Sequence, residues 1–441
     1  MSKVGVVGGG AAGLALAHDL SRAGHQVTLF EATSELGGLA RSFQFGDIHI
    51  ERYYHFICAG DIGYFRKLRE LGIEDKLRWK PTKMGFFNQG KLYPFSSGFD
   101  LLKFGGTNVV GRFRYGFLIL YCLFVNHWRH LDQIPAEQWL MRLLGYNTYM
   151  VTWYPLLKVK FGEYHDRISA AWVWHRIHRV AQSRKTPLHR EMLGYLEGGT
   201  DIFIKSLVQE LRQHRGSVML SRPVAKIIVD DGQVWGLHTT DGQRWHFDYV
   251  VSAVPLPVFL HLTPDLPPDY RSKLAAIDFI GVICLILRLR YPLTGNFWLN
   301  INDPRVPFNG CIEYTNLNKQ ATSDGSAVLY VPYYLPHKHE RFHYSDEQLL
   351  QECAKALTIV SRDFNVDWII DYAVTRDPFA QVICTNDFAQ RIPAHVTPIR
   401  NLYLIESSQL YPADRTISST IDLAHKVALT IVETERSTGN V

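Results

Sequence analysis

A glycine loop between an apolar strand and a helix, close to the N-terminus, limits most strongly what this chain can fold into. Residues 3–7 predict a strand, Gly8-Gly9-Gly10-Ala11-Ala12-Gly13 follows it, and residues 14–23 predict a helix of small and apolar side chains. A second apolar strand, residues 27–30, ends at Glu31. Strand, loop, helix and strand within about thirty residues have the size of one βαβ unit. The sequence therefore predicts an α/β fold.

The same loop has the residues that a dinucleotide requires. Gly8 permits a tight turn, Gly10 allows the phosphates to approach the backbone, and Gly13 allows the helix to pack on the strand. The free N–H groups and the dipole of the helix N-terminus offset the phosphate charge. Glu31 lies eighteen residues after Gly13, where an acid can accept hydrogen bonds from an adenosine ribose. The predicted cofactor contacts in this unit are Gly8, Gly10, Ala11, Ala12, Gly13, Glu31 and Ala32.

A second glycine pair follows in the stretch ELGGLARS, residues 35–42. A Gly-Gly pair followed by an arginine is most often a turn. Because this one comes directly after the ribose-binding strand, it can instead wrap the cofactor, with Arg41 near the pyrophosphate. The predicted contacts here are Gly37, Gly38, Leu39, Ala40 and Arg41.

Three separated blocks resemble a known flavoprotein superfamily. Residues 4–43 resemble the N-terminal signature of the amine oxidases, protoporphyrinogen oxidases and phytoene desaturases. The similarity continues at Glu197-Gly198-Gly199 and over residues 224–257. The resemblance implies FAD in a Rossmann-like domain of the GR2 type, and a mixed-sheet plus helical substrate domain over the flavin ring. It also implies that the Val224 backbone contacts the adenine.

The order of these blocks implies that the two domains are interleaved along the chain. Residues 98–192 are rich in Trp, Arg and His and are expected to be mainly helical. The expected division is an FAD-binding domain of residues 1–80, 196–256 and 398–441, and a substrate domain of residues 81–195 and 257–397.

The C-terminal block departs from the superfamily's usual pattern. A Gly-Asp or Gly-Glu pair commonly follows the last strand, but here the strand 401–405 leads into Glu406-Ser407-Ser408 without a glycine. We expect Glu406 to replace that acid, and the backbone N–H groups of Ile417 and Ser418 to face the flavin. The segment YPADR, residues 411–415, resembles a bacterial branch of NAD(P)/FAD-dependent oxidoreductases.

Two residues are candidates for catalysis beside the flavin. His55 follows the second glycine pair closely, and an imidazole with a pKa near 6.5 could act as a base or bond near flavin N5. A lone histidine is more often a packed structural residue. Lys160 could hold a water at N5, as a lysine does in the amine oxidases that the chain resembles.

Two further groups of residues are candidates for binding the substrate. Arg176 and Arg179 are three apart on a predicted helix and could clamp a phosphate or diphosphate, although a solvated basic face is the default. Several aromatics could line an apolar tunnel or could be ordinary core side chains. These are Trp298, Tyr330, Tyr333, Tyr334 and Tyr411.

Composition excludes several other classes of protein. The six cysteines are far apart, without CxxC or zinc spacing, which argues against a disulfide framework and a structural metal. The net charge of +5 is small for 441 residues and is not gathered in one tract, which argues against nucleic acid as a partner. Free thiols and no secretory signal predict a cytoplasmic protein.

One apolar run is either part of the core or a contact with a membrane. Residues 115–125 are eleven uncharged residues, too few for a span, which needs about 20. They form either a buried core helix or a helix lying on the bilayer, with Arg112, Arg114, Trp128 and Arg129 at the headgroups. The second option predicts a peripheral protein on the inner face of the membrane, attached through residues 112–129.

Together these features predict an FAD-dependent oxidoreductase, an oxidase, dehydrogenase or desaturase, acting on a lipophilic substrate such as a prenyl lipid. No second GxGxxG is present, so oxygen or a quinone is the expected electron acceptor. A second hypothesis is a non-redox flavoenzyme, because residues 48–56 and 90–94 loosely resemble UDP-galactopyranose mutase, which acts on a nucleotide sugar. A third is a flavin-stabilised binding protein without turnover. The number of subunits is left open.

Overall fold

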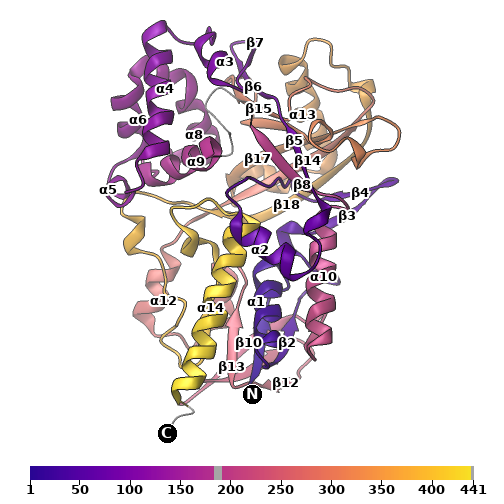
Figure 1. The fold of residues 1–441 in the computed structure, drawn as a ribbon, viewed down its shortest axis with the longest axis vertical. Coiled ribbons are helices and arrows are strands. Elements are labelled where there is room, and N and C mark those ends of the chain that lie inside the picture. The colour runs from indigo at the N-terminus through magenta and orange to yellow at the C-terminus, as the bar shows by residue number, and fades with distance from the viewer. Residues whose placement is uncertain (183–190, 439–441) are drawn as a thin grey trace.

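A computed structural model describes residues 1–182 and 191–438, and a five-stranded parallel sheet forms its lower half (Figure 1). Each strand is short and apolar, and the four residues Val4 to Val7 are almost completely buried. In spatial order the strands are β19 (Leu402–Leu404), β13 (Tyr249–Ser252), β1 (Lys3–Val7), β2 (Gln26–Phe30) and β9 (Ser217–Met219).

Helices bury one face of this sheet. The apolar sides of these helices pack into one hydrophobic core with β1 and β2, and Leu14, Phe203 and Ile421 are fully buried in it. The first helix begins at Ala11, inside the glycine loop and three residues before the predicted start. The helices of this core are α1 (Ala11–Arg22), α2 (Ile62–Glu70), α10 (Thr200–Gln213) and α14 (Ile417–Thr438).

A seven-stranded sheet lies above the parallel sheet in Figure 1. Its neighbouring strands are antiparallel except for one parallel pair, formed by residues 298–302 and 84–88, so this is a mixed sheet. In spatial order the strands are β18 (Ile369–Val382), β14 (Phe279–Leu289), β17 (Ala327–Pro336), β16 (Gly310–Glu313), β15 (Trp298–Asn302), β6 (Met84–Asn88) and β7 (Lys91–Pro94).

A helical region stands beside the mixed sheet, at the upper left of Figure 1. Its core is rich in tryptophan, since Trp139, Trp153 and Trp172 are all buried there. The predicted helical stretch 98–192 is described up to residue 182, and its residues 183–190 lie outside the described part. The helices are α3 (Gly98–Leu102), α4 (Val109–Phe124), α5 (Arg129–Asp132), α6 (Ala136–Leu144), α7 (Tyr146–Thr152), α8 (Tyr154–Phe161) and α9 (Ala170–Gln182).

Smaller elements connect these layers. A three-stranded sheet carries the predicted adenine-side strand, and two-stranded ribbons pair residues 42–45 with 48–51 and residues 77–81 with 192–196. These elements are β10 (Val224–Asp230), β11 (Gln233–Thr239), β12 (Arg244–His246), β3 (Ser42–Phe45), β4 (Ile48–Glu51), β5 (Leu77–Pro81), β8 (Met192–Leu196), α11 (Leu256–Leu262), α12 (Pro268–Ala275) and α13 (Asp346–Val360).

The predicted α/β class is confirmed. The strands of the parallel sheet come from three distant parts of the chain, which is the arrangement that an interleaved fold requires. The assignment of residue ranges to an FAD-binding and a substrate domain stays a prediction. Among the described residues, no helix has the length and apolar character needed to cross a bilayer.

Candidate active site

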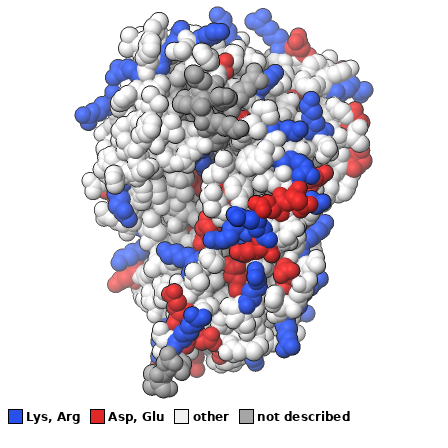
Figure 2. All heavy atoms as spheres, in the orientation of Figure 1, with Lys and Arg blue, Asp and Glu red and all other residues white. Residues whose placement is uncertain are grey.

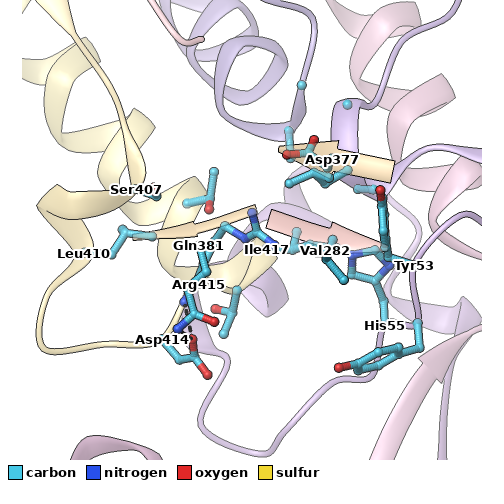
Figure 3. A pocket seen from close by; sticks show the side chains of 18 of the residues that line it. Tyr53, His55, Val282, Asp377, Gln381, Ser407, Leu410, Asp414, Arg415 and Ile417 are labelled. Carbon is cyan, nitrogen blue, oxygen red and sulfur yellow. Dashed lines mark hydrogen bonds between the residues drawn. The ribbon is translucent and has the colours of Figure 1, made fainter. Parts of the chain in front are cut away.

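One large cavity, of about 880 Å³, connects all of these layers. It opens at the carboxyl ends of β1, β13 and β19, where ligands of parallel sheets commonly bind. It then passes along β14, β17 and β18 and reaches the inner faces of α4, α8 and α9. Figure 3 shows its central part, with His55 and Arg415 directed into it from different segments.

The predicted cofactor-binding residues gather around one end of this cavity. Gly13 is the exception, because it packs behind the loop against Gly8. The residues that line the cavity are Gly8, Gly10, Ala11, Ala12, Glu31, Ala32, Gly37, Gly38, Leu39, Ala40, Arg41, Val224, Glu406, Ile417 and Ser418.

The glycines of the loop have three different physical reasons to be glycine. Gly8 adopts a left-handed backbone conformation with φ of +107°, which other residues rarely adopt. A Cβ on Gly13 would lie 1.9 Å from the Gly8 carbonyl oxygen, so α1 could not approach β1. A Cβ on Gly10 would meet nothing within 4 Å and would project into open space. That free space beside a helix N-terminus is where a pyrophosphate would fit.

Glu31 and the second glycine pair hold this loop in place. The Gly9 N–H donates to Glu31 Oε2 at 2.8 Å, and the Gly37 N–H donates to the Gly9 carbonyl at 2.8 Å. Arg41 forms an ion pair with Glu35, with 3.2 Å between Nη1 and Oε2. The buried Nε of Arg41 has no hydrogen-bond partner among the described residues. Arg41 thus lines the cavity with one N–H that no described residue accepts.

The departure at the C-terminal block preserves a carboxyl at the cavity wall. Glu406 Oε1 accepts a hydrogen bond from the Ser408 N–H at 2.9 Å, whereas its buried Oε2 has no partner among the described residues. Burial raises the pKa of Glu406 to about 7. Thr416 caps α14 by accepting from the Ser419 N–H at 3.0 Å, which leaves the N–H groups of Ile417 and Ser418 as first-turn donors.

His55 lies in the cavity as a neutral imidazole. Burial, together with the charge of Arg415, lowers its pKa to about 4. Its Nδ1 has no hydrogen-bond partner among the described residues. His55 can thus donate to or accept from a ligand at neutral pH without carrying charge.

Lys160 lies at the end of α8 in an aromatic box. Its Nζ is 4.5 Å from the ring centre of Tyr334 and 5.1 Å from that of Trp172. The residue is only 7% exposed, and it still lines the cavity. Burial, and then the positive charge of Arg176, lower the pKa of Lys160 to about 7. A lysine in this state can exchange a proton near neutral pH.

Both predicted phosphate-clamping arginines line the cavity, but each has a carboxylate partner. Arg176 Nη1 is 2.8 Å from Asp414 Oδ2, and Arg179 Nη2 is 3.1 Å from Asp61 Oδ2. The partners come from distant segments, so no sequence pattern predicts these pairs. The structure thus replaces the default of a solvated basic face with two partly buried ion pairs.

The structure corrects the prediction for several aromatic residues. Tyr333 and Tyr411 do not line the cavity. Tyr333 is 1% exposed and packs against Phe308 on the opposite face of the mixed sheet. The Tyr411 hydroxyl is buried in hydrogen bonds with Asp132 and Ser169. The same holds for Tyr330, whose hydroxyl donates to the Glu51 carbonyl, whereas Trp298 and Tyr334 do line the cavity.

Three cavity residues were not predicted individually. Tyr54 bonds to Tyr334 through their hydroxyls, which are 3.2 Å apart, and Asp414 and Arg415 lie beside Lys160. The YPADR segment was the available signal for the last two, because a charged pair next to a helix N-terminus suits a polar ligand.

Comparison with known proteins supports a flavin site. The model of the family "Flavin containing amine oxidoreductase" matches residues 11–408. The chain is 24% identical to a zeta-carotene desaturase from Synechocystis sp., over 92% of both chains.

Solved structures share the fold. A protein from Exiguobacterium sp. 255-15, provisionally named a protoporphyrinogen oxidase, superposes with a TM-score of 0.78 at 20% identity, over 97% of this chain and 98% of that one. Reduced UDP-galactopyranose mutase gives 0.77 at 16% identity, over 98% and 96% of the two chains. Because the family model covers most of the sequence, the chain belongs to the flavin-containing amine oxidoreductases and is an FAD-dependent oxidoreductase.

Proposed function

We propose that this enzyme oxidises or desaturates a lipophilic substrate of the prenyl type at a membrane surface. One observation carries the proposal: the same cavity touches the glycine loop at one end and an apolar helical wall at the other. Tyr115, Ile119 and Leu156 belong to that wall. An apolar wall of this kind suits a hydrocarbon ligand. The named substrate of the desaturase relative, zeta-carotene, is itself apolar.

In this proposal the glycine loop holds the FAD diphosphate, beside the open space at Gly10 and the free Nε of Arg41. Glu31 receives the ribose, and Val224 lies at the adenine end. Glu406 faces the polar side chain of the cofactor, with the first turn of α14 at its flavin. Bound FAD would accept a hydride equivalent from the substrate.

Lys160 and His55 would handle protons in this reaction. Lys160 has a pKa of about 7, so its amine can receive a proton from the substrate carbon. His55 stays neutral and contributes an uncharged imidazole to the cavity wall. The surrounding rings of Trp172 and Tyr334 exclude water from the amine.

The outer face of α4 would attach the enzyme to the membrane. Phe113, Phe117, Leu120 and Phe124 recur every three or four residues and are 44–79% exposed. Residues 101–131 contain Lys103, Arg112, Arg114 and Arg129 and no acidic residue. Figure 2 shows a largely white surface with blue at its rim over α4 and α6. An apolar stripe with basic neighbours suits the inner, anionic face of a cytoplasmic membrane.

The decisive experiment is an anaerobic visible spectrum of the FAD-loaded enzyme, before and after adding a prenyl-lipid extract, and separately NADPH. Bleaching of the flavin bands by the extract, but not by NADPH, is the expected result. The Lys160→Met variant should bleach more slowly by about a hundredfold, in the range of lost general base catalysis. The control Arg362→Gln, an exposed position remote from the cavity, should match the wild type.

The same preparation tests the nucleotide-sugar alternative. A mutase would need a diphosphate site, yet Arg176 and Arg179 are already paired with Asp414 and Asp61. Bleaching by NADPH alone, with a UDP-sugar perturbing the reduced flavin spectrum, would overturn the proposed lipid oxidation.

A further inference from the structure

A cluster of positive charges lies in the cavity at the junction of α8, α9 and the segment before α14. Lys160, Arg176 and Arg415 surround a single carboxylate, Asp414. Arg176 is bonded to that carboxylate, with 2.8 Å between Nη1 and Oδ2. Figure 3 shows Arg415 reaching into the cavity above Asp414. Arg179, which is paired with Asp61, also acts on Asp414, so four cations and two carboxylates leave an excess of positive charge at this point.

Two of these cations have no partner for their N–H groups. The side chains of Lys160 and Arg415 form no hydrogen bond or ion pair with any residue among 1–182 and 191–438. Lys160 is instead held over aromatic rings, which do not use its directed donors. Lys160 is buried, whereas Arg415 is exposed at the edge of the cluster. A buried cation without an acceptor is costly, and a ligand carrying negative charge would remove that cost at Lys160.

The cluster is continuous with the apolar end of the cavity. Leu156 and Lys160 are four residues apart on α8, so they lie on the same helix face about one turn apart. Both line the cavity, as do Tyr115 and Ile119 on the inner face of α4. A molecule lying along α8 would therefore contact apolar side chains at one end and cationic side chains at the other.

We propose that the substrate is an amphiphile whose anionic headgroup, a phosphate or carboxylate, binds Arg415 next to the Lys160 amine while its chain lies against α8 and α4. This inference rests on the proposed lipid substrate and adds the chemistry of its polar end. The cofactor diphosphate is assigned to the glycine loop, so the cluster is a second, separate anion site. The pKa of Lys160 is lowered to about 7, as expected for a buried amine that has no anionic group bonded to it.

The test is a headgroup series on the FAD-loaded, full-length enzyme. Farnesyl phosphate, farnesoic acid, farnesol and inorganic phosphate are titrated, and the dissociation constant is read from the flavin spectrum and tryptophan quenching. We expect farnesyl phosphate or farnesoic acid to bind at least about tenfold more tightly than farnesol, as one charge-assisted contact provides. The tighter of the two identifies the headgroup, and inorganic phosphate alone should bind weakly.

Variants assign the preference to the cluster. Arg415→Gln should reduce the preference for the anionic ligand about tenfold and leave the affinity for farnesol unchanged. Arg362→Gln, outside the cavity, should keep the full preference. If Arg415→Gln fails to retain FAD, Lys160→Gln provides the same comparison.

The two proposals fail in different ways. Equal affinities for farnesol and the anionic ligands, or an unchanged preference in Arg415→Gln, would overturn the anionic headgroup and leave lipid oxidation standing. Absence of binding by all three farnesyl compounds, together with no bleaching by prenyl lipids, would overturn the proposed function itself.

Discussion

A methyl group added at Gly10 would meet open space, whereas one added at Gly13 would meet the backbone. Substitutions at the two glycines therefore affect cofactor binding and folding stability separately. Gly10→Ala adds a methyl group to open space, so we expect a melting temperature close to wild type without FAD and a clear loss of FAD content. Gly13→Ala forces its methyl group to within 1.9 Å of the Gly8 carbonyl, which should cost about 1–3 kcal/mol of unfolding free energy. Absorbance at the flavin bands and thermal melting measure the two effects.

Burial of Lys160 makes the unfolding free energy of the protein depend on pH in a predictable direction. Its pKa in the folded protein, about 7, is below the value of 10.5 expected when unfolded. Between these values the unfolded chain binds more protons, so the unfolding free energy rises with pH. At pH 6 the buried amine is charged and most costly. We therefore expect Lys160→Met to stabilise the enzyme more at pH 6 than at pH 9, by about 2–3 kcal/mol in urea unfolding. An equal gain at both pH values would contradict the lowered pKa.

At this scale the sequence predicts what depends on local geometry and misses what depends on distant partners. The loop glycines could be assigned because their neighbours in the chain dictate their conformation. The ion pairs of Arg176 and Arg179 could not, because Asp414 and Asp61 are 238 and 118 residues away. Such pairs are fixed only when the tertiary structure brings the segments together.

Among the elements, α4 has two faces with different tasks. Its inner face contributes Tyr115 and Ile119 to the cavity, and its outer face exposes a stripe of phenylalanines. The triple variant Phe113→Ser, Phe117→Ser, Phe124→Ser should lose at least about a hundredfold in affinity for anionic vesicles, because each phenylalanine contributes apolar burial. Co-sedimentation with phosphatidylserine vesicles measures this affinity.

A matched control removes three exposed apolar side chains elsewhere. Tyr291→Ser, Val366→Ser and Ile370→Ser lie outside α4 and are 46–57% exposed. This control should bind vesicles like the wild type. Equal vesicle binding by both triple variants would show that α4 is not the attachment surface.

Strand β17 explains why the aromatic assignment was partly wrong. Sequence patterns identify the inward face of a strand from alternating apolar and polar residues. β17 is buried on both faces, as nearly all its residues show, so no alternation marks the cavity side. Tyr333 and Tyr334 are neighbours and necessarily point to opposite faces. Only the packing of α13 against one face decides which tyrosine reaches the cavity.

For the whole molecule, the cavity connects the parallel sheet, the mixed sheet and the helical region. A ligand bound there stabilises the folded chain by mass action. We expect FAD at a hundred times its dissociation constant to raise the unfolding free energy by about 2.7 kcal/mol. Thermal melting at increasing FAD concentration measures this effect, with AMP as a partial ligand for comparison. A melting temperature independent of FAD would contradict a cavity that binds the cofactor reversibly.

The fold class could be predicted, because the βαβ unit and its glycine loop have a local signature. The mixed sheet was expected from the resemblance, but its strand order was not. Pairing between strands more than two hundred residues apart produces no pattern in the sequence. β6 and β15, for example, pair in parallel across that distance.

The strand order of the parallel sheet also determines when a newly made chain can take up its cofactor. β1 emerges first, but its neighbour β13 follows only at residue 249, and the edge strand β19 only at residue 402. Until then the nascent chain exposes an unpaired apolar strand edge, the kind of surface that chaperones shield. Glu406 and the first turn of α14 leave the ribosome later still. Capture of a flavin in this cavity would therefore follow the synthesis of α14, because Glu406 and the first turn of that helix complete the cavity wall.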